Sequence, residues 1–555
     1  MQKSVPPGDL SSENFTNEEI ISLLKSLEKR ISKIEDYLNL EVEPVTEPAI
    51  ITESGNIEYH DKEEELEYKI GQFWLAKAGI IVLVIGITFF LTFPYKNLPS
   101  FFPPIFGYII SAAIYGFSIY CIKNYSYICG YLLGGSLTLL FFTTLRLHFF
   151  SQSVIINNIS PELILLLLVV VFSLIISVGK RSIYLTGLSI AFGYITAIVS
   201  DNSYFLFITV ILISSLIVFL KIKYNWEYLI HFGIILTYFT HFIWFLNNPL
   251  VGKAIQTITS PELNLIFVLL YAAVFASGNI LGENKEAEKT PSIISSFMNV
   301  IGAYSLMFII TLSMIKEGIT IYHLLASILF LIIAVIFWTK TESKYSTFIY
   351  AMLGYLALSS AIVFQFSSPN FFIYLCWQSL LVVSTAVWFK SKYIVLANFI
   401  IYVIIFIAYL AMEGKISIVS ISYGIVALLS ARILNWKKDR LSLKTEQMRN
   451  AYLVTALFII PYSLYHAIPE GWVSISWIAV AILYYIMSLI LKNKKYRWMA
   501  LLTLLLTLGY VFIIGITSSD PTYKIVSFVV LGAVMIIVSL LYTKFKKSLK
   551  SILKP

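Results

Sequence analysis

From residue 72 onward, the chain alternates between apolar runs of about 20 residues and short polar connections. A helical run of that length, rising 1.5 Å per residue, spans the roughly 30 Å hydrocarbon core of a bilayer. Backbone groups in lipid must be bonded within their own segment, which helices achieve and open sheets do not. The pattern therefore predicts about 18 transmembrane helices, at residues 72–93, 102–122, 125–145, 161–179, 182–200, 203–220, 227–246, 262–281, 292–315, 320–339, 346–366, 370–389, 392–411, 415–434, 450–467, 471–491, 497–515 and 523–543.

A different pattern precedes these runs, in residues 16–40. Thr16 and Glu19 have the spacing of a capping box, which predicts the start of a helix. Apolar residues then alternate at steps of four and three, as in a coiled coil: Ile20, Leu24, Leu27, Ile31, Ile34 and Leu38. Two interpretations stay open, a coiled coil that makes a homo-oligomer and an amphipathic helix that folds back on its own chain. Residues 41–66 are typical of a charged, flexible linker.

Composition agrees with a membrane protein, because 58% of the 555 residues are hydrophobic, only 13% are charged, and the mean hydropathy is +0.82. The charges are unevenly distributed, and acidic residues dominate only at the start. We predict an acidic cytoplasmic head at 1–71, a transmembrane domain at 72–545 and a basic cytoplasmic tail at 546–555. The fold class is all-α, a polytopic integral membrane helical bundle.

Lys and Arg gather in every second connection and in the tail. By the positive-inside rule, this distribution predicts both termini in the cytoplasm, and we expect the bacterial cytoplasmic (inner) membrane. The amino terminus lacks the apolar core of a cleavable signal peptide, so the first span is expected to direct insertion. Since the basic residues form short clusters between apolar runs, we expect the lipid bilayer as a partner and no nucleic acid.

The basic connections resemble one another: KIKYNW at 221–226, TKTESKY at 339–345, KSKY at 390–393 and KNKKYRW at 492–498. A repeat of helical hairpins with a period near 50 residues accounts for this likeness. Two spans with tight connections give the same period without duplication, and basic and aromatic residues favour the membrane interface in any case. Both explanations stay open.

Three segments carry a resemblance to a known family: ELEYKIGQFWLAKAGIIVLVIGITFFLTF at 65–93, YSYICGYLLGGSLTLLFFTTLRLHFF at 125–150, and the stretch from LTGLSIAFGYITAIVSDN at 185–202 to HFIWF at 241–245. The chain resembles a bacterial family of multi-pass membrane proteins of unknown function, which start with a cytoplasmic coiled coil. Family positions correspond to Ile70, Gly71, Trp74, Leu75, Gly79, Gly86 and the Leu133–Gly135 pattern. The chain departs from the family at AFGYITA (191–197), which lacks a proline. The resemblance implies the fold and no reaction.

Glycines predict where helices pack closely. Gly130, Gly134 and Gly135 make a surface of small residues on the third span, and Gly79 and Gly86 make another on the first. Lys77 lies on the opposite face of the first span, shallow enough for its ammonium to reach the cytoplasmic headgroups. We interpret Lys77 as a marker of topology at the interface, and a functional role is the open alternative.

Candidate chemistry lies near the helix ends of the predicted outer side. It comprises Arg146, His148, His241, His323 and His466 with Glu262, Glu317 and Glu470. Together they could line a site for the headgroup of a lipid-linked substrate, with His or Glu as general base. They could equally be unrelated interfacial residues on different helices. No carboxylate lies deep within a span, which disfavours an ion-coupled transporter.

No motif for phosphate binding, metal ligation or nucleophilic catalysis stands in a recognisable context. Cys121, Cys129 and Cys376 lie in or beside apolar runs without a paired spacing, so we expect neither a disulfide nor a zinc site. No cofactor and no metal are predicted. The leading hypothesis is a non-enzymatic role, either translocation of an amphipathic or neutral envelope molecule or scaffolding of an envelope complex. The alternative is a transferase or ligase acting on a lipid-linked substrate at the outer face.

Overall fold

A computed structural model describes residues 75–92, 99, 101–121, 126–149, 155–282, 290–314, 318–413, 418–436, 445–469, 472–513, 525–527 and 529–536. The chain divides into two units, Met1–Leu75 and Ala76–Pro555, and the fold reported below is that of the second. The predicted coiled coil at 16–40, the linker at 41–66 and the tail at 546–555 lie outside the described residues.

The described part of the chain is helical and contains no strand. Its helices are α3 (Leu75–Thr92), α4 (Phe102–Cys121), α5 (Ser126–Leu145), α6 (Ile159–Gly179), α7 (Ile183–Val199), α8 (Ser203–Tyr224), α9 (Glu227–Phe245), α10 (Asn264–Gly282), α11 (Thr290–Ser313), α12 (Ile319–Ile336), α13 (Lys344–Gln365), α14 (Asn370–Trp388), α15 (Lys392–Glu413), α16 (Ile418–Trp436), α17 (Thr445–Ala467), α18 (Val473–Ile490) and α19 (Lys494–Ile513). Further helical residues lie at 525–527 and 529–536. Short helices follow α9, at Pro249–Val251, and α12, at Phe337–Thr341.

Each of the apolar runs that the sequence marks corresponds to one of these helices. Fourteen of the described helices are long and apolar enough to cross a membrane. The prediction of an all-α, polytopic membrane protein is therefore confirmed. The span predicted at 203–220 is longer than expected, since α8 continues to Tyr224.

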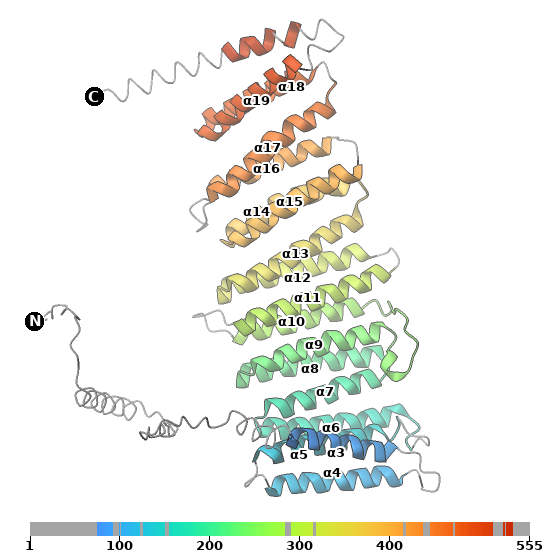
Figure 1. Cartoon of the computed structure of the whole chain (residues 1–555). Helices are drawn as coiled ribbons and strands as arrows, with labels where there is room; N and C mark the ends of the chain where they lie inside the picture. Colours follow the sequence, from blue (N-terminus) through green and yellow to red (C-terminus); the bar gives the residue numbers. More distant parts are fainter. Residues whose placement is uncertain are drawn as a thin grey trace, which may run out of the picture. The chain divides into compact units, whose positions relative to one another are not determined.

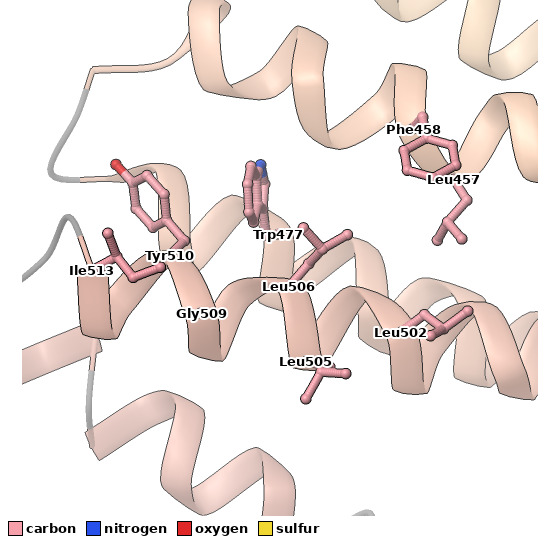
Figure 2. Close-up of a pocket in the computed structure, with 9 residues that line it drawn as sticks. All are labelled: Leu457, Phe458, Trp477, Leu502, Leu505, Leu506, Gly509, Tyr510 and Ile513. Carbon is pink, nitrogen blue, oxygen red and sulfur yellow. The ribbon is translucent and has the colours of Figure 1, made fainter.

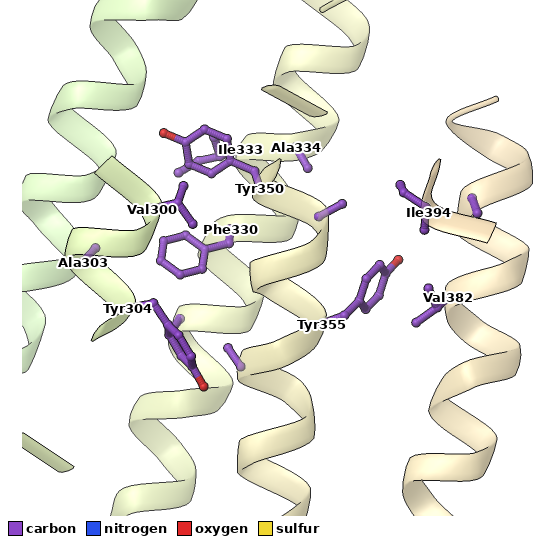
Figure 3. Packing of buried hydrophobic residues seen from close by; sticks show 14 of the residues in the cluster. Val300, Ala303, Tyr304, Phe330, Ile333, Ala334, Tyr350, Tyr355, Val382 and Ile394 are labelled. Carbon is purple, nitrogen blue, oxygen red and sulfur yellow. The ribbon is translucent and has the colours of Figure 1, made fainter. Parts of the chain in front are cut away.

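Each helix packs mainly against the next helix of the chain and the next but one. For example, α8 packs against α9 and α10, and α11 packs against α9 and α13 (Figure 1). Short connections produce this arrangement, because they leave consecutive helices antiparallel and side by side. The largest hydrophobic cluster follows the same order, from Ile190 of α7 to Ala500 of α19. Figure 3 shows part of it, where the rings of Phe330 and Tyr350 lie 6.3 Å apart.

The turns at the basic end of the helices share one backbone conformation. A non-glycine residue with positive φ stands in five of them: Arg181, Asn225, Glu342, Lys390 and Lys492. This left-handed residue ends one helix, and in four turns the next residue caps the following helix. The caps are Ser182, Ser343, Ser391 and Asn493. The likeness of the basic connections therefore has a conformational basis in addition to the preference of charges for the interface.

The α4–α5 hairpin corrects one prediction. Cys121 at the end of α4 and Cys129 in the first turn of α5 form a disulfide, with Cα atoms 6.2 Å apart. The expectation of no disulfide was wrong, because it considered only spacing along the sequence. Antiparallel packing across the short connection places the two residues opposite each other. Cys376 is buried and free.

Two of the glycines singled out in the sequence lie against a neighbouring helix. A Cβ atom at Gly134 would lie 3.2 Å from Leu185 of α7, and one at Gly135 would lie 3.2 Å from Ile80 of α3. These distances are slightly shorter than ordinary van der Waals contact, so an added methyl group would displace the Leu185 or Ile80 side chain by a few tenths of an ångström. Nothing lies within 4 Å of the corresponding position at Gly79, Gly86 or Gly130.

Candidate functional site

Hydrogen bonds between buried tyrosine and asparagine side chains join alternate helices. Tyr238 of α9 donates to Oδ1 of Asn299 on α11, at 2.7 Å. Asn299 Nδ2 donates in turn to the hydroxyl of Tyr350 on α13, at 2.9 Å, and to the carbonyl of Ala272 on α10, also at 2.9 Å. One buried amide thereby connects four helices.

A similar arrangement, with a buried asparagine at its centre, joins α14, α15 and α17. Nδ2 of Asn398 on α15 donates to the hydroxyl of Tyr452 on α17, at 3.0 Å, and to Oγ of Ser379 on α14, at 2.8 Å. Before these, the hydroxyls of Tyr194 on α7 and Thr237 on α9 lie 2.6 Å apart. We call this set the polar spine: Tyr194, Thr237, Tyr238, Asn299, Tyr350, Asn398 and Tyr452. Such bonds hold membrane helices together where burial of apolar surface gives no preference over lipid.

A buried lysine lies near the basic end of the same helices. Lys221, in the last turn of α8, is only 2% exposed. Its Nζ donates to Asn279 Oδ1 at 2.8 Å and to the carbonyl of Gly278 at 3.1 Å, and it lies 3.6 Å from the carboxylate of Glu227. Asn279 then donates to Ser295 Oγ, at 2.8 Å. In the sequence, Lys221 belongs to the basic connection KIKYNW at 221–226, and nothing in the pattern distinguishes it from exposed Lys223.

Two of the predicted histidines are fully buried in separate surroundings. His241 of α9 stacks on Phe207, with ring centroids 4.8 Å apart, and neither ring nitrogen has a hydrogen-bond partner among the described residues. His323 of α12 lies between the hydroxyls of Tyr304, at 3.3 Å, and Thr311, at 3.2 Å. Neither histidine is placed to act on a substrate at the surface.

The other predicted residues lie apart. Arg146 is buried just after α5, and Nδ1 of His148 lies 2.7 Å from the carbonyl oxygen of Ile156. His466 at the end of α17 is exposed, and Glu262 before α10 is exposed too. Lys77 belongs to α3, but its side chain, like Glu317 and Glu470, lies outside the described residues. Each of these described residues lies in separate surroundings, and the structure does not bring them into one cavity. They are Arg146, His148, His241, His323, His466 and Glu262.

One carboxylate is more buried than the sequence implied. Glu162, in the first turn of α6, is fully buried, and neither carboxylate oxygen has a hydrogen-bond partner among the described residues. A buried ionisable group in a membrane protein is a candidate for function. The sequence showed only a carboxylate near a helix end.

An apolar groove of about 540 Å³ lies between α17, α18 and α19. We call it the terminal groove, and its lining residues are Leu457, Phe458, Trp477, Leu502, Leu505, Leu506, Gly509, Tyr510 and Ile513. Figure 2 shows Trp477 and Tyr510 toward one end of the groove and Leu457 and Leu502 toward the other. Pro461 lies inside α17, one turn beyond Leu457, and its carbonyl accepts a hydrogen bond from the indole of Trp477 at 3.0 Å.

Comparison with known proteins gives one match. Residues 71–460 match the profile of the family described as "Predicted membrane protein (DUF2339)". This range begins at the first span and includes the whole polar spine, whereas most of the terminal groove lies beyond it. No curated protein and no solved structure matches the chain.

Proposed function

We propose that this chain, which belongs to the family of predicted membrane proteins (DUF2339), is a membrane scaffold. Its helices keep fixed positions and offer their lipid-facing sides to other components of the bacterial envelope. The observation that carries the proposal is the polar spine, which ties α7 to α9, α9 to α11, α11 to α13, and α15 to α17. The proposal includes the orientation with both termini in the cytoplasm of the inner membrane.

The spine favours a fixed arrangement over translocation for an energetic reason. Alternating access moves groups of helices against one another around a binding site. Each hydrogen bond between membrane helices contributes about 0.6–2 kcal/mol, and moving a helix pair apart breaks such bonds in a medium with no water to replace them. In the described residues, the hydroxyls of Tyr238 and Tyr350 both bond to the amide of Asn299, so these groups are occupied by one another and do not line a path for a polar solute.

Oligomerisation through the predicted coiled coil at 16–40 completes the proposal, because a scaffold that self-associates presents several copies of its surface. Anionic headgroups repel the acidic charge of the head, which favours a head extended away from the membrane surface and accessible to other copies.

Distances between spin labels at the two ends of the helices test whether the arrangement is fixed. One pair replaces exposed Tyr228 and Tyr345 at the basic end, and the other replaces exposed Leu250 and Ile321 at the opposite end. A scaffold gives a single distance for each pair in liposomes. A translocator populates two states, and its two ends change in opposite directions.

The result that contradicts the scaffold is a double distance distribution at both ends. The head is tested separately by deleting residues 16–40 from the full chain. Mass measurements in detergent should then show loss of the oligomer, while thermal unfolding of the membrane domain stays the same. An oligomer that survives the deletion excludes the coiled coil as its cause and leaves the membrane arrangement to be judged by the labels.

A further inference from the structure

The terminal groove is formed by helices with the composition of membrane spans. Two of the three helices that form it, α18 and α19, are long and apolar enough to span a bilayer. Its rim faces outward, because Phe458, Leu505 and Ile513 are 64%, 62% and 74% exposed. An outward-facing apolar groove between membrane spans excludes water, so its occupant must be an apolar chain from within the bilayer.

The length of the groove distinguishes between two kinds of apolar occupant. Along α19 the lining runs from Leu502 to Ile513, which is about 16 Å at 1.5 Å per residue. This is close to the hydrocarbon thickness of one leaflet, about 15 Å or half of the bilayer core. Ile513 is the last described residue of α19 and lies near the end of the span predicted at 497–515, so we place one end of the groove near the membrane surface and the other near the midplane. A lipid chain has this reach, whereas a transmembrane helix of a partner would need a groove about twice as long.

Aromatic rings lead from the groove to an exposed histidine at the surface end. The ring of Tyr510 lies 5.2 Å from Trp477 and 6.0 Å from Tyr465, and Tyr465 lies 4.9 Å from His466. Tyrosine and tryptophan favour the level of the lipid headgroups, where an apolar ring and a polar atom are both accommodated. Imidazole and hydroxyl groups there can donate to a phosphate oxygen.

We propose that the terminal groove binds one phospholipid of the surrounding bilayer, with an acyl chain along α19 and the phosphate beside His466. Lipid tails are as apolar as leucine, so transfer from bulk lipid contributes little to binding. Retention rests instead on the fit of the chain to the groove and on the headgroup contact. This proposal does not depend on the scaffold function, since the groove lies at the other end of the chain from the predicted head.

Native mass spectrometry of the full-length chain, extracted with a mild detergent from membranes containing phosphatidylethanolamine and phosphatidylglycerol, tests the proposal. The wild type should retain one phospholipid per chain. Gly509→Trp should lower the retained fraction about tenfold or more, because nothing lies within 4 Å of a Cβ atom at Gly509 and the indole can occupy the groove. His466→Leu should lower it about threefold by removing the headgroup contact.

Gly116→Trp is the matched control, since Gly116 of α4 is also open within 4 Å and lies far along the chain from the groove. If Gly509→Trp lowers the thermal unfolding temperature, Leu506→Trp narrows the groove from an exposed position and takes its place. Unchanged retention in the groove variants overturns the proposal, as does an equal loss in Gly116→Trp. The proposal is also overturned if the wild type retains no lipid. It is overturned as well if the wild type retains a free fatty acid, a polyprenyl phosphate or a protein chain in place of a phospholipid.

Discussion

The central helices α8–α13 and the terminal helices α17–α19 differ in how they are held together. In the centre, Lys221 and Asn299 are buried and bond to side chains on neighbouring helices. At the terminal end, the space beside α19 is an apolar groove, and Pro461 interrupts the bonding of α17. The difference teaches that buried polar contacts fix the central helices against one another, whereas the apolar lining of the groove leaves a surface that lipid can share.

Among the substitutions that test this comparison, the one at Lys221 is expected to have the largest effect on stability. Lys221→Met keeps the approximate length of the side chain but removes the bonds to Asn279 and Gly278 and the charge beside Glu227. Loss of one partner leaves buried polar groups unsatisfied, and we expect a loss of about 3 kcal/mol of stability. Unfolding by sodium dodecyl sulfate in mixed micelles measures it. Lys223→Met, on the exposed side of the same turn, is the control and should change stability by less than about 0.5 kcal/mol.

Asn299→Leu should come next, with a loss of about 2 kcal/mol, because Tyr238, Tyr350 and the carbonyl of Ala272 all lose a partner. Adding Tyr350→Phe should recover part of this loss, since the second change removes one of the unsatisfied hydroxyls. The same unfolding assay measures Asn299→Leu, Tyr350→Phe and the double variant. A double variant as unstable as the sum of the two single variants would show that the spine bonds act independently.

A smaller effect is expected at the terminal end from Trp477→Phe. The change keeps an aromatic ring in the groove and removes the single hydrogen bond to Pro461. We expect a loss of about 1 kcal/mol. Intrinsic fluorescence is altered by the substitution itself, so unfolding is followed by circular dichroism. A loss as large as that of Asn299→Leu would remove the contrast between the two regions.

The smallest effect is expected from Gly509→Ala. No atom lies within 4 Å of the added methyl group, and alanine favours a helix over glycine by about 1 kcal/mol. Stability should therefore stay the same or rise by less than about 1 kcal/mol. Gly135→Ala is the contrasting variant, because its methyl group would lie 3.2 Å from Ile80, and it should destabilise the domain. Thermal unfolding of the two variants side by side sharpens the distinction between open and close-packed surfaces.

The helices could be predicted because the length and apolar composition of each run are enough to make it a membrane-spanning helix. Backbone bonding in lipid is local, so a run such as 203–220 is sufficient to place α8 to within a few residues. The candidate site could not be predicted in the same way. His241 and His323 looked alike as polar residues near helix ends, yet stacking on Phe207 and bonding to Tyr304 separate them in the structure.

The sequence by itself determined a membrane protein with many helices, their approximate positions and their order, because hydrophobicity and chain length act within each segment. Only the tertiary structure decided which polar groups are buried, Glu162 among them, and what they contact, such as Lys221 on Asn279 and Asn299 on Tyr350. It also decided the disulfide between Cys121 and Cys129. These outcomes depend on which face of one helix meets another, and that choice is made by packing between segments.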